Sequence, residues 1–279
     1  MRWRASEVID RLAAAPRTGL VFVDEYGHRR DYTFAEVSTY SQRYAAVLRA
    51  FGVKSGDRAY VSLSTTAKCA FTLLALQRLG AQAVYDLQQA SGAAVVIANR
   101  KYRPKVDAER EHFSPQAVYA LIGEECEGWA RIDTVAQMAS PIAGIEMTPD
   151  EAAVKSARMQ AREYLGAVET DIVWCATRFE EHGWFERALV QPWLLGAAAV
   201  AHNHPFDAQE RLDLLRELDV TILLQRAEEY HTELALPDPK RFKMPRLRRC
   251  IVLDDGSDAV LESQWAQRFG VQLMPSGAP

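Results

Sequence analysis

Two places in the second half of the chain bring together side chains that could do acid–base or metal chemistry. Glu181 and His182 are adjacent, and a carboxylate beside an imidazole can act as a general acid and base near neutral pH. A solvated loop is the favoured interpretation of the same pair. His202 and His204 alternate along a predicted strand and so share one face, as two metal ligands would. Because the sequence identifies no further ligand that must converge on them, a structural role is favoured and no metal is expected.

A third segment has the composition of a phosphate-binding loop. Ser64-Thr65-Thr66-Ala67-Lys68 combines hydroxyl groups with a lysine, but it contains no glycine. Loops that hold phosphates with backbone N–H groups usually concentrate glycine, and neither GxGxxG nor GxxxxGK[ST] occurs in the chain. We therefore interpret Ser64–Lys68 as the N-terminal cap of a helix.

Composition excludes several classes of protein. The 279 residues carry 33 basic and 37 acidic side chains, a net charge of −4, with the two signs interspersed, so no nucleic-acid footprint is expected. No apolar run approaches the roughly 20 residues of a membrane helix, and the N-terminus does not resemble a signal peptide. The four cysteines lie far apart near apolar residues, as in a reduced, cytoplasmic protein.

The order of predicted elements in the first half is that of a layered α/β fold. Ser6 is a candidate cap for a short helix over 6–14. A capping box, Thr33 with Glu36, starts a helix that runs to about Phe51. Around these, the patterns predict a hairpin with strands at 20–23 and 29–32, strands at 58–63, 93–98 and 118–122, and a helix over 67–79.

The same alternation of helices and strands continues in the second half, after a connector at 139–149. Thr148 and Pro149 are the expected start of a helix that ends near Gly166. Glu228 to His231 is interpreted as a polar helix face. We expect two similar α/β sub-domains, 1–140 and 141–279. The predicted strands are 171–176, 198–202, 220–224, 249–253 and 271–273, and the predicted helices are 184–195, 207–218, 226–234 and 258–268.

Five segments, in the same order, resemble adenylate-forming (AMP-binding) enzymes, nearest to medium-chain acyl-CoA synthetases and benzoate-type CoA ligases. They span most of residues 18–273 and imply a reduced form of the large N-terminal domain of that family. The segments are Tyr32–Val37 with Leu48–Arg58, Leu73–Ala81, Asp171–Cys175 with Gly183-Trp184, Gln191–Ala197 with Phe206-Asp207, and Trp265–Gly270.

The resemblance implies ATP, Mg²⁺ and CoA as cofactors, but the residues that would hold ATP are not found. The family's loop near "TSGTTGxPK" should lie in Thr134–Asp150, which has one glycine and no lysine. The family's adenine turn falls on Asp254 and Asp255, followed by Gly256, and two adjacent carboxylates would repel ATP; a solvated turn is favoured there. The "YGxTE" segment and the C-terminal domain with its lysine are expected to be absent. We therefore assign no catalytic residue and no cofactor.

Gly183 and Trp184 match the family best. In the family this pair borders the acyl pocket, so with Glu181 and His182 it forms the candidate ligand pocket. The alternative is that Trp184 is a core aromatic at the junction of a strand and a helix.

These observations favour a degenerate synthetase homologue that cannot adenylate and acts as a binding or interaction module. Its expected partners are an acyl or aromatic carboxylate, an intact synthetase paralogue or a second copy of itself. Two alternatives stay open. The chain could retain acid-CoA ligase activity with a separate partner chain, or new chemistry at Glu181, His182 and Asp255. It could also be a structural homo-oligomer, in which neighbours cover exposed sheet edges.

Overall fold

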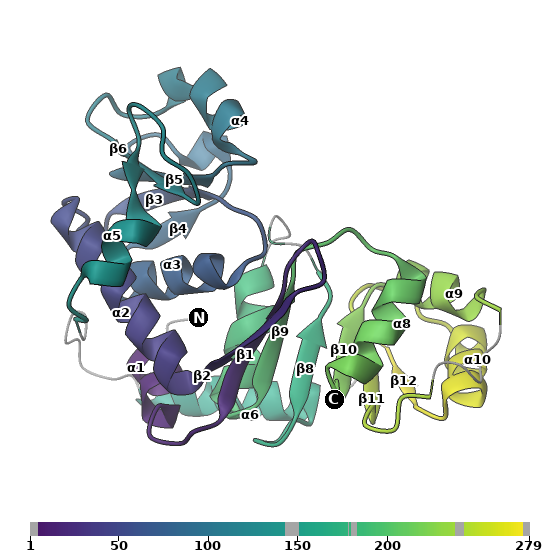
Figure 1. Ribbon diagram of the computed structural model, residues 1–279. Helices are drawn as coiled ribbons and strands as arrows, with labels where there is room; N and C mark the ends of the chain where they lie inside the picture. Colours follow the sequence, from purple (N-terminus) through teal and green to yellow (C-terminus); the bar gives the residue numbers. More distant parts are fainter. Residues whose placement is uncertain (1–4, 143–150, 178, 180–182, 238–242, 276–279) are drawn as a thin grey trace. The chain divides into compact units, whose positions relative to one another are not determined.

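The computed structural model describes residues 5–142, 151–177, 179, 183–237 and 243–275. The chain divides into two compact units, residues 1–17 with 32–151, and residues 18–31 with 152–279. The α/β class expected from the sequence is confirmed, because each unit is built on a mainly parallel sheet with helices (Figure 1). The proposed division into sub-domains at residue 140 stays a prediction.

The first unit is built on a five-stranded parallel sheet with strand order β4-β3-β5-β6-β7. Its strands follow short turns, and helices connect most of them, as parallel pairing requires. The strands are β3 (Arg58–Ser62), β4 (Gln82–Val84), β5 (Val95–Asn99), β6 (Val118–Ile122) and β7 (Ala130–Arg131). The helices are α1 (Ala5–Val8), α2 (Phe34–Ala50), α3 (Ala67–Arg78), α4 (Arg103–Ala108) and α5 (Ile132–Met138).

Local signals set the ends of the helices in this unit. The capping box of α2 is confirmed: the Thr33 hydroxyl accepts from the Glu36 amide at 3.2 Å, and the Glu36 carboxylate accepts from the Thr33 amide at 2.7 Å. The predicted helix over 6–14 is wrong, because α1 ends at Val8 and Ser6 lies inside it. After α1 the chain turns, and the Asp10 carboxylate accepts two hydrogen bonds from the buried guanidinium of Arg78, at 2.5 and 2.8 Å.

The phosphate-loop look-alike is the start of α3. Thr66 is the N-cap, and its hydroxyl accepts from the Cys69 amide at 3.2 Å. The Lys68 ammonium lies 2.6 Å from a carboxylate oxygen of Asp133, whose side chain is 4% exposed. The interpretation of Ser64–Lys68 as a helix cap is therefore confirmed, and the lysine is committed to an ion pair.

The second unit is built on a seven-stranded sheet with strand order β12-β11-β10-β8-β9-β1-β2. The strands are β1 (Thr18–Val23), β2 (Arg29–Thr33), β8 (Ile172–Cys175), β9 (Ala198–His202), β10 (Ile222–Gln225), β11 (Arg249–Val252) and β12 (Leu273–Met274). The α-helices are α6 (Glu151–Leu165), α7 (Gln191–Leu194), α8 (Ala208–Glu217), α9 (Ala227–Leu234) and α10 (Ala259–Phe269), and a π-helix spans Phe185–Val190. Strands β8 to β12 and β1 pair in parallel.

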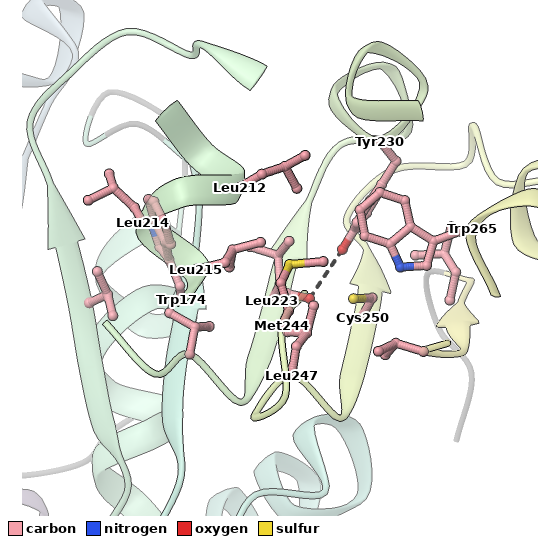
Figure 2. Packing of buried hydrophobic residues seen from close by; sticks show 14 of the residues in the cluster. Trp174, Leu212, Leu214, Leu215, Leu223, Tyr230, Met244, Leu247, Cys250 and Trp265 are labelled. Atoms are coloured by element: carbon pink, nitrogen blue, oxygen red, sulfur yellow. Dashed lines mark hydrogen bonds between the residues drawn. The ribbon is translucent and has the colours of Figure 1, made fainter. Parts of the chain in front are cut away.

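The core of this unit fills the space between one face of the sheet and α8, α9 and α10. Trp174 on β8 lies beside Leu215 of α8, whereas Cys250 on β11 lies beside Trp265, below Tyr230 (Figure 2). The Tyr230 hydroxyl donates to main-chain oxygens on β10 and β11, both at 3.2 Å, and its ring meets Trp265 edge-on at 4.7 Å. Helix α9 is thus fixed to two strands at once.

The interpretation of Glu228 to His231 as a polar face is wrong for Tyr230, which is completely buried. Glu228 and His231 are exposed, as expected.

All four cysteines are free thiols, three of them buried and Cys126 partly buried. Within the described residues, no helix combines the length and the apolarity needed to cross a bilayer.

Candidate functional site

Strand β8 leads to the candidate ligand pocket, and its amino end is firmly held. The Arg248 guanidinium donates to both oxygens of Asp171, at 3.0 and 2.5 Å, and the Val168 amide donates to Asp171 Oδ2 at 2.7 Å. Burial alone would raise the pKa of Asp171, but these hydrogen bonds hold that pKa below its ordinary value. The Asp-Ile-Val-Trp-Cys segment therefore begins at an ion pair that fixes the start of the strand.

Gly183 and Trp184 lie between β8 and the following helical segment. Gly183 has a φ of +78°, which only glycine adopts without strain. The Trp184 side chain is 2% exposed and meets the Phe179 ring edge-on at 5.7 Å. This burial is compatible both with the wall of a closed pocket and with a plain core position. The other two predicted pocket residues, Glu181 and His182, lie outside the described residues.

A π-helix follows directly, over Phe185–Val190. Such wide turns are rare and occur often at functional sites. Arg187 lies on this segment, and its guanidinium approaches within 3.7 Å of the point where a Cβ on Gly183 would stand. Sequence reasoning missed Arg187, although its place four residues after the glycine could have drawn attention to it.

Tyr164 interacts electrostatically with both Cys175 and Arg187. Burial raises the pKa of the Tyr164 hydroxyl, the neighbouring Cys175 raises it further, and the charge of Arg187 opposes both. Tyr164 comes from α6 and Cys175 ends β8. Near the carboxyl end of β8, the phenol of Tyr164 therefore interacts electrostatically with a thiol and with the guanidinium of Arg187, and an arginine can pair with an organic carboxylate.

The turn that aligns with the family's adenine contact has a clear structural role. Asp254 Oδ1 accepts from the amides of Ala227 at 3.2 Å and Gly256 at 3.3 Å, so it holds the start of α9. A Cβ on Gly256 would stand 2.7 Å from that of Ala227, which explains a glycine there. Asp255 is exposed. The turn thus positions α9, and its use as an adenine site stays a prediction.

Beneath this turn, a buried polar chain links α8, β10 and α9. Arg211 donates to Gln225 at 2.7 Å, and Gln225 donates to Glu233 Oε2 at 2.6 Å. Complete burial raises the pKa of Glu233 from 4.5 to about 8; nearby Glu229 adds to the shift, and Arg211 and Gln225 oppose it. Sequence reasoning missed this chain, because nothing in the pattern marks Glu233 as an inward residue.

Among the described residues, His202, His204 and Glu210 bring metal-ligating atoms close to one another.

Residues 9–112 match the sequence model of the AMP-binding enzyme family. The mitochondrial acyl-coenzyme A synthetase ACSM4 of Mus musculus is 24% identical over 317 residues, covering 96% of this chain and 54% of that protein. An uncharacterized acyl-CoA ligase, YtcI, of Bacillus subtilis is 21% identical, in an alignment that covers 94% of this chain and 55% of that protein.

Solved structures agree with these matches. An acyl-CoA synthetase from Brucella canis superposes with a TM-score of 0.84 at 20% identity, over 96% of this chain and 56% of that one. In sequence the chain is similar to acyl-CoA synthetases and to part of the AMP-binding enzyme family. It has the fold of their N-terminal part, and it spans about half the length of the curated relatives it matches.

The anthranilate CoA ligase AuaEII, solved in complex with anthranoyl-AMP, superposes with a TM-score of 0.83 at 19% identity, over 98% of this chain and 59% of that one.

The stretch matched to the mouse synthetase covers 317 residues, whereas the whole chain has 279. The relative therefore carries internal segments that have no counterpart here.

Proposed function

We propose that this chain is an acyl-CoA synthetase-like binding domain that holds an organic carboxylate beside Trp184 and does not adenylate it. The observation that carries the proposal is the composition of Thr134–Asp150, where the family places its phosphate loop. The segment has one glycine and no lysine, and Thr134 to Met138 are part of α5.

The physical argument concerns the charge of ATP. Attack of a carboxylate on the α-phosphate brings two anions together, so the reaction depends on cations and backbone N–H groups placed around the phosphates. The one lysine in a comparable setting, Lys68, is paired with Asp133 at 2.6 Å. Asp254 and Asp255 at the adenine turn add negative charge instead of removing it. Together these features support binding without adenylation.

Carboxylate binding is supported by the residues around Gly183. A relative of the same fold was solved with an anthranoyl-AMP ligand. In this chain the π-helix brings the Arg187 guanidinium beside Gly183, and charge-assisted pairing with a carboxylate is the strongest contact that an arginine makes. A cytoplasmic location, and association with an intact synthetase or with a second copy of the chain, belong to the same proposal.

Calorimetric titration with benzoate and with medium-chain fatty acids tests this proposal. We expect saturable binding that needs neither ATP nor Mg²⁺, and an affinity at least about tenfold lower in Arg187→Met, which removes a charge-assisted contact. Arg216→Met is the matched control, since that exposed arginine pairs with Asp213 on the surface of α8 at 3.4 Å. Benzamide, a neutral analogue, should bind both variants alike. Equal loss in both variants, or binding only in the presence of ATP, would count against the proposal.

A further inference from the structure

The carboxyl end of β9 and the first turn of α8 bring two imidazoles and a carboxylate together. His202 is the last residue of β9, His204 follows in the connecting loop, and Glu210 lies on α8. One ligand atom from each lies within 4.8 Å of the other two. Strand β9 and helix α8 belong to the same unit, so the arrangement does not depend on how the two units meet.

His202 has an unusual environment for a polar side chain. Its side chain is 5% exposed, and its Nε2 atom is buried without a hydrogen-bond partner among the described residues. Glu210 Oε1 lies 3.7 Å from it. The ring is held edge-on against Trp174 at 5.4 Å. Buried polar atoms normally have a hydrogen-bond partner or a ligand, so this unpaired imidazole nitrogen marks a place where one can bind.

The second histidine and the carboxylate complete a ligand set for a metal. His204 Nδ1 lies 2.8 Å from Glu210 Oε2, with the His204 side chain 37% exposed. Two histidines and a glutamate form a known zinc ligand set, which leaves one position open. Zinc bonds of about 2.0–2.2 Å place tetrahedral ligand atoms about 3.3 Å apart. The ligand atoms of the three side chains now lie within 4.8 Å of one another. Each separation therefore has to shorten by about 1.5 Å or less to match the tetrahedral spacing.

Arg211 follows Glu210 on α8 and is a cation that would oppose a metal nearby. Its guanidinium stacks over Trp174 at 4.5 Å, donates to Gln225 at 2.7 Å and approaches Glu229 at 4.0 Å. Its charge is therefore directed toward the polar chain in the core.

We propose that His202, His204 and Glu210 form a binding site for a divalent transition metal of the Zn²⁺ type. The ligand atoms are Nε2 of His202, Nδ1 of His204 and one carboxylate oxygen of Glu210. The metal connects the end of β9 to the start of α8 and keeps an open position on the exposed side, next to His204. Imidazole and carboxylate ligands suit zinc and cobalt better than calcium or magnesium.

Titration of the chelator-treated, untagged protein with Co²⁺ tests the site, because a four- or five-coordinate Co²⁺ centre absorbs visible light. We expect one equivalent to bind with these absorption bands and Zn²⁺ to displace it. His204→Gln and Glu210→Gln should weaken binding by about 100-fold or more, since even the partners of a ligand contribute about 10- to 100-fold. Both side chains are partly exposed, so the variants should fold, and circular dichroism checks this.

His112→Gln is the matched control. That histidine forms a surface pair with Glu109 at 3.1 Å, but it is not part of the group formed by His202, His204 and Glu210. This variant should bind Co²⁺ with the affinity of the wild-type protein. Zn²⁺ should also raise the midpoint of its thermal unfolding as much as it raises that of the wild-type protein. The proposal is overturned if the wild-type protein shows no saturable band, or if His204→Gln and Glu210→Gln bind Co²⁺ as tightly as the control.

Discussion

Replacement of Glu233 by glutamine should make the stability of this protein less dependent on pH. Glu233 is completely buried, and its pKa is raised from 4.5 to about 8. A carboxyl group whose pKa is higher in the folded than in the unfolded state binds its proton more tightly in the folded state. Its contribution to stability is therefore full below the unfolded-state pKa and is lost as the pH rises toward the folded-state pKa.

The size of the effect follows from the two pKa values. Each pH unit between 4.5 and about 8 removes about 1.4 kcal/mol of the free energy of unfolding, so the whole interval is worth up to about 5 kcal/mol. About 3 kcal/mol of that falls between about pH 5.5 and about pH 9. Glutamine keeps an oxygen that can accept from Gln225 and carries no charge, so Glu233→Gln should be the more stable protein at the alkaline end.

Urea unfolding followed by tryptophan fluorescence measures the difference, with Trp265 as a local reporter because its ring contacts Tyr230 on the same helix as Glu233. Glu228→Gln, an exposed position on that helix, is the control and should parallel the wild-type protein at every pH. If the stability curves of Glu233→Gln and the wild-type protein run parallel between about pH 5.5 and about pH 9, burial does not raise the pKa of Glu233.

Three further changes test the scaffold. Asp171→Asn should lower the free energy of unfolding by about 2 kcal/mol at neutral pH. Because the pKa of Asp171 is lowered by folding, this loss should disappear as the pH falls below 3.8; a loss that is the same at all pH values would contradict the assignment. Lys68→Met should cost about 1 to 2 kcal/mol by leaving Asp133 without its ammonium partner, with no effect on ligand titrations, and a weakened ligand response would refute the cap interpretation. Gly256→Ala should cost about 1 to 3 kcal/mol in urea unfolding, because the new methyl group meets Ala227, and an unchanged midpoint would show that the turn is not tight.

Features set by neighbouring residues could be predicted from the sequence. The capping box of Thr33 and Glu36, the cap at Thr66 and the buried strand over β5 all depend on side chains within a few positions of the backbone that they affect. The helix predicted over 184–195 was right in position but not in kind. The backbone there widens into a π-helix over Phe185–Val190 before α7 begins at Gln191, and hydrophobic periodicity does not distinguish a π-helix from an α-helix.

Features that depend on distant residues could not be predicted. Asp10, which follows the short helix α1, is paired with Arg78, a residue far along the chain. Glu233 has the sequence context of a surface glutamate, and its burial follows from the packing of α9 against two strands. His202 and His204 were identified as a pair, but Glu210 joins them only because α8 folds back beside the end of β9.

The most direct test of the proposed function is exchange of radiolabelled pyrophosphate into ATP by the purified protein, with Mg²⁺ and a broad panel of carboxylic acids. Acids that bind in calorimetry should be included in the panel. We expect no acid-dependent exchange above the protein-free background, because Thr134–Asp150 offers neither the lysine nor the glycine-rich backbone that the phosphates require. Robust exchange with any acid would contradict it.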